Sequence, residues 1–235
     1  RRDYGNAQAG TRGSRRRQIW VTAVRNNPAA GPGHDRVSAL VRAQYEDNPY
    51  PRLVSFQRRA PAPLDTVLRA QLPALRAIPR FETPLRVLVA GCGTGQHALT
   101  AATRYADARV TAIDLSRASL GRAARLADRW GLDNLRFVAA DLLDAVHLGE
   151  RFHVVESVGV LHHLERPAAG LAALVEVTEP GGLLLLGLYS ERGRQDVVAA
   201  RALIHERGWP PTAEGIRAAR DAIARLPADH PARPV

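Results

Sequence analysis

The sequence predicts an α/β protein built on a doubly wound parallel sheet. From Arg86 onward, short runs of β-forming residues alternate with stretches of helical periodicity, which is the order expected of parallel strands joined by crossover helices. A glycine-rich turn directly follows the first of these runs. A chain of 235 residues, 46% of them hydrophobic, can also bury a core large enough to cover such a sheet.

Five runs are expected to form the strands. They share a β-rich, largely apolar composition, and they are residues 86–90, 108–114, 134–141, 152–158 and 182–189. The helical stretches between them are residues 96–105, 116–130 and 167–177. Ser116 is expected to cap the second of these helices, and Pro167 begins the third. Right-handed crossovers then produce the doubly wound order.

Four segments are expected along the chain. Residues 1–35 are predicted to form a flexible basic arm and a linker, because charged, glycine and proline residues dominate them. Residues 36–82 are predicted to form a helical extension whose second helix is interrupted at Pro73. The sheet occupies residues 83–190. Residues 191–235 add two helical stretches, 196–207 and 213–225, without a further strand pattern.

The charge of the chain is strongly positive, with a formal net charge of +10 and 33 basic residues. All of these are arginine, which indicates a coding bias more than selection for a nucleic-acid surface, so a solvated arm is favoured over an RNA-binding one. No apolar run approaches the roughly 20 residues of a membrane span. The single cysteine, Cys92, can form no internal disulfide. We therefore expect a soluble, cytoplasmic protein without a membrane partner.

The stretch LRVLVAGCGTGQHAL places three glycines, Gly91, Gly93 and Gly95, where a strand should lead into a helix. In a doubly wound sheet, ligands bind at this edge, beyond the carboxyl ends of the strands. Gly91 permits a tight turn, whereas Gly93 and Gly95 remove side chains where a ligand would lie, and the next helix presents free N–H groups. The third glycine of a dinucleotide fingerprint would fall on Gln96, which argues against a nicotinamide cofactor.

Residues 86–189 resemble the class I S-adenosylmethionine-dependent methyltransferases, whose fold is Rossmann-like. The resemblance implies that the glycine loop wraps the methionine part of the cofactor, which leaves as S-adenosylhomocysteine. It also implies that Asp114 binds the ribose hydroxyls and that Asp141 meets the adenine amino group. The implied cofactor-binding residues are Ala90, Gly91, Cys92, Gly93, Gly95, Asp114, Leu115, Asp141, Leu142 and Ser157.

The chain departs from the family pattern at two places. The usual loop reads D-x-G-x-G-x-G, and its acidic position falls on Val89, so a contact often made to the methionine amino group is missing or supplied elsewhere. The family's sheet normally ends in an antiparallel strand hairpin, which residues 191–235 do not contain, so a truncated domain is expected.

The segment QYEDNPYPR, Gln44 to Arg52, resembles a stretch that precedes this domain in some bacterial methyltransferases that also carry tetratricopeptide repeats, although no such repeats are present here. Tyr45, Asn48 and Tyr50 are candidates for a lid over the cofactor, with a hydrophobic plug as an equal alternative.

The stretch SVGVLHHLE resembles the part of the family where substrate and sulfonium meet. Glu156 and His162 are the candidate catalytic residues. Glu156 could instead form a wall of the cofactor pocket or be a polar residue at the end of a strand. His162 could instead pack at the start of a helix. The adjacent His162 and His163 point in different directions on a helix, so we expect no metal site.

The predicted function is methyl transfer from S-adenosylmethionine to an unidentified small molecule or protein side chain. An RNA methyltransferase that uses the arginine-rich arm is one alternative. A non-catalytic module that binds S-adenosylmethionine is the other, motivated by Val89 and by the expected truncation.

Overall fold

The computed structural model describes residues 21–23, 36–51, 60–77, 84–105 and 107–233. The chain divides into two compact units, Arg1–Leu186 and Gly187–Val235.

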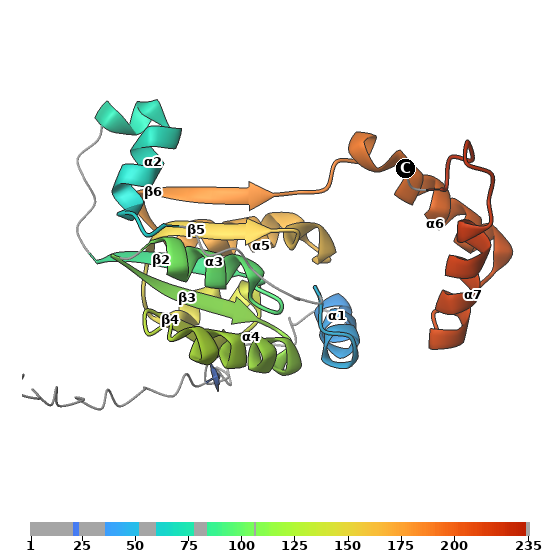
Figure 1. The fold of residues 1–235 in the computed structure, drawn as a ribbon, viewed down its shortest axis with the longest axis horizontal. Coiled ribbons are helices and arrows are strands. Elements are labelled where there is room, and N and C mark those ends of the chain that lie inside the picture. Colours follow the sequence, from blue (N-terminus) through green and yellow to red (C-terminus); the bar gives the residue numbers. More distant parts are fainter. Residues whose placement is uncertain (1–20, 24–35, 52–59, 78–83, 106, 234–235) are drawn as a thin grey trace, which may run out of the picture. The chain divides into compact units, whose positions relative to one another are not determined.

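The first unit is built on a six-stranded parallel sheet in the order β1-β4-β3-β2-β5-β6 (Figure 1). The strands are β1 (Val21–Ala23), β2 (Leu85–Ala90), β3 (Ala108–Asp114), β4 (Leu135–Ala139), β5 (Phe152–Val158) and β6 (Thr178–Gly187). From β2 the chain builds outward through β3 and β4, then returns to add β5 on the other side of β2. The direction of winding therefore reverses between β2 and β5, which confirms the doubly wound fold and places a switch point at the end of β2.

Helices cover both faces of this sheet. The elements of the first unit are α1 (Arg36–Asp47), α2 (Leu64–Gln71), α3 (Gln96–Arg104), α4 (Arg117–Trp130) and α5 (Pro167–Glu176), with short 3₁₀ segments η1 (Pro73–Ala77), η2 (Leu142–Leu148) and η3 (Leu161–His163). Val87 and Val89 of β2 pack with α2, α3 and α4 in one core cluster. Leu88 and Ala90 pack with α5, η2 and η3 in the other. Successive residues of a strand point to opposite faces, so β2 contributes to both cores.

The predicted helix signals match the structure. The Ser116 hydroxyl accepts the N–H of Ser119 at 3.0 Å and so caps α4, which ends where Gly131 adopts a left-handed conformation with φ 64°. Pro167 stands in the first turn of α5. Pro73 separates α2 from η1, as its missing N–H leads one to expect.

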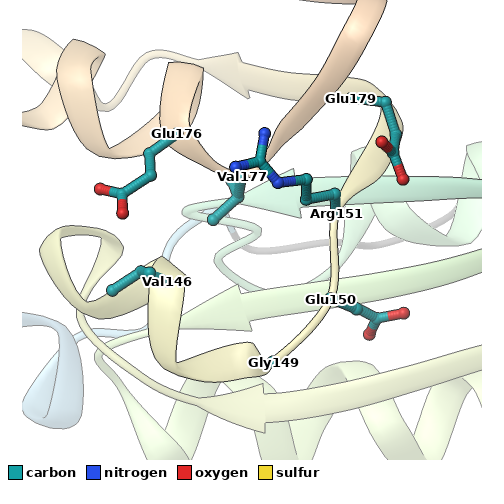
Figure 2. Close-up of a pocket in the computed structure, with 7 residues that line it drawn as sticks. All are labelled: Val146, Gly149, Glu150, Arg151, Glu176, Val177 and Glu179. Atoms are coloured by element: carbon teal, nitrogen blue, oxygen red, sulfur yellow. The ribbon is translucent and has the colours of Figure 1, made fainter.

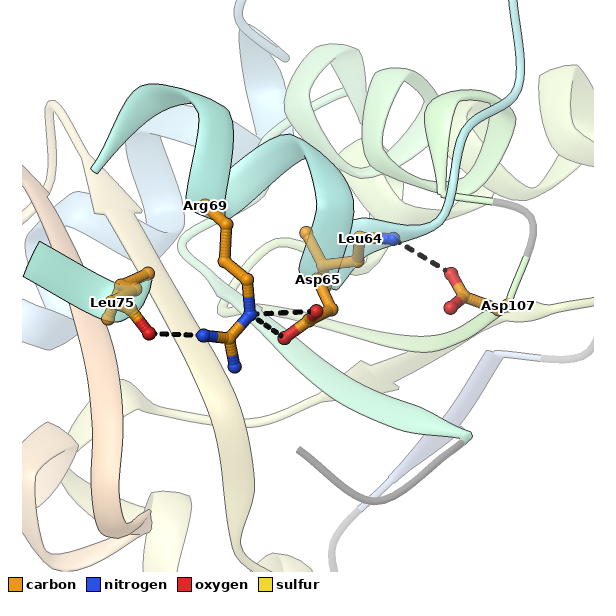
Figure 3. Close-up of polar contacts among 5 residues, drawn as sticks. All are labelled: Leu64, Asp65, Arg69, Leu75 and Asp107. Atoms are coloured by element: carbon orange, nitrogen blue, oxygen red, sulfur yellow. Dashed lines mark hydrogen bonds and ion pairs between the residues drawn. The ribbon is translucent and has the colours of Figure 1, made fainter. Parts of the chain in front are cut away.

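Hydrogen bonds hold the helical extension against the sheet domain (Figure 3). The backbone N–H of Leu64 donates to Asp107 Oδ1 at 2.9 Å, which fixes the start of α2 beside β3. Arg69 donates from Nε to both carboxylate oxygens of Asp65 at 2.9 Å and from Nη1 to the carbonyl of Leu75. Arg69 thus ties α2 to η1 across the break at Pro73.

Two features of the sheet differ from the sequence prediction. β1 falls within the range predicted as arm and linker, yet Val21 pairs in register with Phe137 of β4. Valine and threonine favour strands, and an existing sheet edge supplies the partner that a three-residue strand needs. The remaining residues of the predicted arm lie outside the described part of the chain. β6 covers Thr178–Gly187, whereas the sequence predicted a strand over residues 182–189. The observed strand includes Pro180, which an edge strand tolerates because one of its sides has no pairing partner among the described strands.

The second unit follows β6 with the 3₁₀ segment η4 (Arg192–Arg194) and helices α6 (Gln195–Arg207) and α7 (Ala213–Ala224). Thr212 caps α7 by accepting the N–H of Gly215 at 3.1 Å. Both helices match the predicted ranges, and the described residues of this unit contain no strand beyond the end of β6. Within the described ranges, no helix has the length and apolar character needed to cross a membrane.

Candidate cofactor site

The glycine loop joins the carboxyl end of β2 to the start of α3. Gly91, Gly93 and Gly95 all have positive φ angles, 76°, 53° and 99°. Residues with a Cβ rarely adopt these angles, so the loop requires glycine at each position. The N–H groups of Gly91 and Cys92 both donate to the carbonyl of Ile113 at 2.9 Å, which fastens the loop to the end of β3.

The glycines also allow close contacts within the protein. A Cβ on Gly91 would lie 2.3 Å from Val160 Cγ2, and one on Gly93 would lie 2.6 Å from the carbonyl oxygen of Tyr50. A Cβ on Gly95 would lie 2.6 Å from that of Ala123 in α4. The sequence predicted that Gly93 and Gly95 remove side chains where a ligand would lie. The structure adds a second reason for glycine, because a Cβ at either position would clash with the protein itself.

Asp114 is the last residue of β3, and its carboxylate holds the loop. Oδ2 accepts the N–H of Gly93 at 2.8 Å, and Oδ1 accepts the N–H of Ser116 at 2.9 Å. Burial raises the pKa of Asp114; the two hydrogen bonds act in the opposite direction, and the charge of Glu46 raises the pKa further. A carboxylate has about four accepting directions, so Asp114 retains two for a ligand.

The start of α4 receives a second cap from α1. Glu46 accepts the N–H of Arg117 at 2.6 Å and that of Ala118 at 3.0 Å, one on each carboxylate oxygen. The hydroxyl of Ser116 also donates to the carbonyl of Tyr45 at 3.0 Å. Sequence analysis missed Glu46, because the N–H groups that it caps lie far along the chain and leave no local pattern.

The turn after α1 contacts the glycine loop itself. Thr94 donates its N–H to the carbonyl of Tyr50 at 3.4 Å and its hydroxyl to the carbonyl of Pro51 at 2.6 Å. The side chain of Tyr50 remains 64% exposed. The structure thus brings the predicted lid segment onto the loop. Thr94 was also missed, although its place inside the glycine motif could have drawn attention to it.

Asp141 and Leu142 lie at the carboxyl end of β4. Asp141 Oδ1 accepts the N–H of Leu143 at 2.9 Å and so caps the start of η2. Ala139, the last residue of β4, pairs in register with Asp114, so Asp141 lies two residues beyond that register position. Leu142, the first residue of η2, is buried in the core cluster that η2 forms with α5 and η3.

The other predicted residues divide between core and surface. Ala90 and Cys92 are buried in the two core clusters, so only their backbone can face a ligand, whereas Leu115 is half-buried beside Asp114. Burial, aided by the charge of Asp114, raises the pKa of the Cys92 thiol. Ser157 at the end of β5 is fully buried, and its hydroxyl finds no hydrogen-bond partner among the described residues.

The histidines that follow β5 belong to η3. The rings of His162 and His163 lie 4.3 Å apart at an angle of 55°. Both ring nitrogens of His162 are shielded from solvent, which favours its packing role over that of a base. Nowhere in the described ranges do three or more His, Cys, Asp or Glu side chains gather as metal ligands would.

A pocket of about 340 Å³ lies at the opposite edge of the sheet, by the amino ends of β5 and β6 (Figure 2). It is lined by Val146, Gly149, Glu150, Arg151, Glu176, Val177 and Glu179. Glu179 pairs with Arg86 at 2.7 Å, and Glu150 pairs with Arg136. These pairs engage two of the four charged side chains that line the pocket.

Comparison with known proteins agrees with the geometry of the glycine loop. Residues 87–182 match a family described as a methyltransferase domain. The chain carries a class I S-adenosylmethionine-dependent methyltransferase domain. The matched range begins in β2 and ends in β6, and so includes the loop, Asp114 and Asp141.

Curated relatives of this methyltransferase domain include two bacterial proteins. An uncharacterized protein from a Synechococcus strain is 37% identical over 149 residues, which cover 62% of this chain and 36% of that protein. A ubiquinone biosynthesis O-methyltransferase from Psychrobacter cryohalolentis is 38% identical over 104 residues, which cover 43% of this chain and 39% of that protein. The match therefore spans less than half the length of either relative.

Among solved structures, one from a study of the conversion of a disulfide bond into a thioacetal group during echinomycin biosynthesis is 30% identical to this methyltransferase domain. The superposition has a TM-score of 0.49 and covers 72% of this chain and 65% of that one. None of these comparisons supports the resemblance to methyltransferases that carry tetratricopeptide repeats.

Proposed function

We propose that this methyltransferase domain binds S-adenosylmethionine at the glycine loop and transfers its methyl group to a small molecule or a protein side chain. The observation that carries the proposal is the Asp114 carboxylate, held by the N–H groups of Gly93 and Ser116 with accepting capacity left over. Two adjacent ribose hydroxyls are a matching pair of donors.

The adenine end of the cofactor would lie toward β4. Asp141 follows the residue paired with Asp114 by two positions, or about 7 Å in the strand direction given the rise of an extended chain, so one nucleoside could contact both carboxylates. Leu115 supplies an apolar surface beside Asp114. The methionine end would then lie toward β5, where Ser157 presents a buried hydroxyl whose hydrogen-bonding capacity the described residues leave unused.

The turn from Tyr45 to Pro51 would form the wall above this site. This proposal is supported by the hydrogen bonds that Thr94 and Ser116 donate to backbone carbonyls of this segment. Tyr45, Asn48 and Tyr50 are the residues we propose for this lid, and the exposed ring of Tyr50 is the one with room to move over a bound ligand.

When bound, S-adenosylmethionine would supply an electrophilic methyl group on a sulfonium. The acceptor atom would attack the methyl carbon in line as the carbon–sulfur bond breaks, and S-adenosylhomocysteine would leave with the electron pair of that bond. The chain's own task is to hold the reactants aligned and to exclude water. The fixed loop and Asp114 serve alignment, and the lid serves exclusion. A general base is needed only where the acceptor atom carries a proton. Methyl transfer to an acceptor atom without a proton requires no base.

Isothermal titration of the folded chain with S-adenosylmethionine and S-adenosylhomocysteine tests the proposal, with NAD as a negative control. Asp114→Ala should weaken both sulfur ligands by about tenfold or more, since hydrogen bonds to a charged acceptor are lost. Asp133→Asn, an exposed acid after α4, is the matched control and should bind as the unaltered chain does. A folded chain that binds neither sulfur ligand would refute the proposal.

The RNA methyltransferase and the non-catalytic module stay predictions. The arginine-rich arm lies outside the described residues, so no contact in the structure favours RNA. An affinity for RNA that falls steeply with salt and vanishes on removal of residues 1–18 would favour the first alternative. Methyl transfer to any cellular fraction would exclude the second.

A further inference from the structure

Val89 and Glu156 are register partners on the neighbouring strands β2 and β5. Val89 lies in β2, one residue before its end, and pairs in register with Glu156 of β5. Val89 is also the position where the usual glycine loop of this family carries an acid. The acid missing from β2 thus has a counterpart on the adjacent strand, directly beneath the glycine loop.

Both side chains lie on the same face of the sheet. Register partners in a parallel pair point to the same side, and the core packing agrees. Val89 and Val154 belong to the cluster formed with α3 and α4, whereas Val155 belongs to the opposite cluster. Alternation along β5 therefore returns Glu156 to the face of Val89.

Glu156 is nearly buried, with 8% of its surface exposed. No hydrogen bond or ion pair joins its carboxylate to another residue in the described part of the chain. Burial raises the pKa of Glu156, and the charge of Arg104 in α3 acts in the opposite direction. An ionised carboxylate buried without hydrogen-bond donors is costly, which points to a cationic ligand that compensates for it.

We propose that Glu156 supplies the carboxylate missing at Val89 and accepts hydrogen bonds from the ammonium group of the cofactor's methionine part. This inference rests on the proposed function and assigns Glu156 a binding role in place of the catalytic one considered from the sequence. The ammonium provides the donors that the protein withholds from this carboxylate. The location agrees, because the pair lies under the loop expected to surround the methionine part of the cofactor.

Titration of Glu156→Gln with two ligands tests the role. S-adenosylhomocysteine carries the ammonium, whereas 5′-methylthioadenosine has the same nucleoside and sulfur but no amino-acid group. The substitution should weaken S-adenosylhomocysteine by about tenfold and change 5′-methylthioadenosine by less than about twofold. Glu176→Gln, an exposed glutamate at the far edge of the sheet, is the matched control and should change neither affinity.

Equal losses for the two ligands would overturn the inference, because they would indicate a general effect on the site. Unchanged S-adenosylhomocysteine binding by Glu156→Gln would overturn it while leaving the proposed function intact. If the unaltered chain binds neither ligand, the proposed function itself fails. Should Glu156→Gln not fold, the exchange variant Val89→Asp with Glu156→Val keeps one carboxylate in the pair. It should still prefer S-adenosylhomocysteine, and loss of that preference would count against the inference.

Discussion

Oδ2 of Asp114 lies 2.8 Å from the backbone nitrogen of Gly93 and accepts a hydrogen bond from its N–H group. The last residue of β3 thereby holds the loop that follows β2. The same carboxylate accepts the N–H of Ser116, which caps α4. The loop, β3 and the start of α4 form one hydrogen-bonded unit, so a change in any of them should be measurable in the others.

Ser116→Ala should lower the free energy of unfolding by about 1–2 kcal/mol, because it removes the cap of α4 and the donor to the Tyr45 carbonyl. Urea denaturation measures this loss, and titration should show weaker S-adenosylhomocysteine binding. Thr212→Ala removes an equivalent cap from α7 in the second unit. The control should leave ligand affinity unchanged; an equal loss of affinity in both variants would contradict the coupling of α4 to the site.

Gly95→Ala should destabilise the chain by about 2–4 kcal/mol. The substitution strains a backbone with φ 99° and drives a Cβ to 2.6 Å from that of Ala123. Gly131→Ala is the control, because φ is 64° there and a Cβ would meet nothing within 4 Å, so only about 1 kcal/mol of backbone strain is expected. Thermal or urea unfolding compares them. Adding Ala123→Gly should recover part of the loss at position 95, and no recovery would show that contact with α4 is unimportant.

Glu46→Gln should loosen α1 from the start of α4. The substitution removes the negative charge of a side chain that accepts two hydrogen bonds from N–H groups at the N-terminus of α4. We expect the free energy of unfolding to fall by about 0.5–1 kcal/mol. Hydrogen exchange should become faster in residues 36–51 and stay unchanged in β2 and β3. Asp47→Asn, an exposed neighbour, should leave exchange as it is. Uniform acceleration through the sheet would show that Glu46 affects global stability and does not specifically hold α1.

Glu156→Gln should stabilise the ligand-free chain at pH 7 but not at pH 4. Burial raises the pKa of Glu156 above its ordinary value of 4.5, so the folded state holds its proton more tightly than the unfolded state does. Stability is therefore lost as pH rises from 4.5 through the raised pKa, and the glutamine variant avoids this loss. Urea denaturation of both chains across that range measures the difference, and a gap that does not widen with pH would contradict the raised pKa.

Local sequence patterns determined most elements of this fold and part of its site. Alternating β-rich and helical stretches predicted β2 to β6, and three glycines after a strand predicted the loop. The serine at position 116 predicted the N-cap of α4, because a serine hydroxyl caps the helix that begins directly after it. Each of these signals lies within a few residues of the structure that it specifies, since hydrogen bonds in helices and turns join near neighbours.

Contacts between distant segments were decided only by the tertiary structure. The pairing of β1 with β4 and the cap that Glu46 places on α4 join residues far apart along the chain. The register of β2 with β5 does the same and sets Glu156 beside Val89. No local pattern encodes these partners, because strand order and register follow from how the helices pack the whole sheet. The sequence by itself determined that the glycine loop follows β2 and that Asp114 ends β3. The assembled sheet determined which charged side chains surround them.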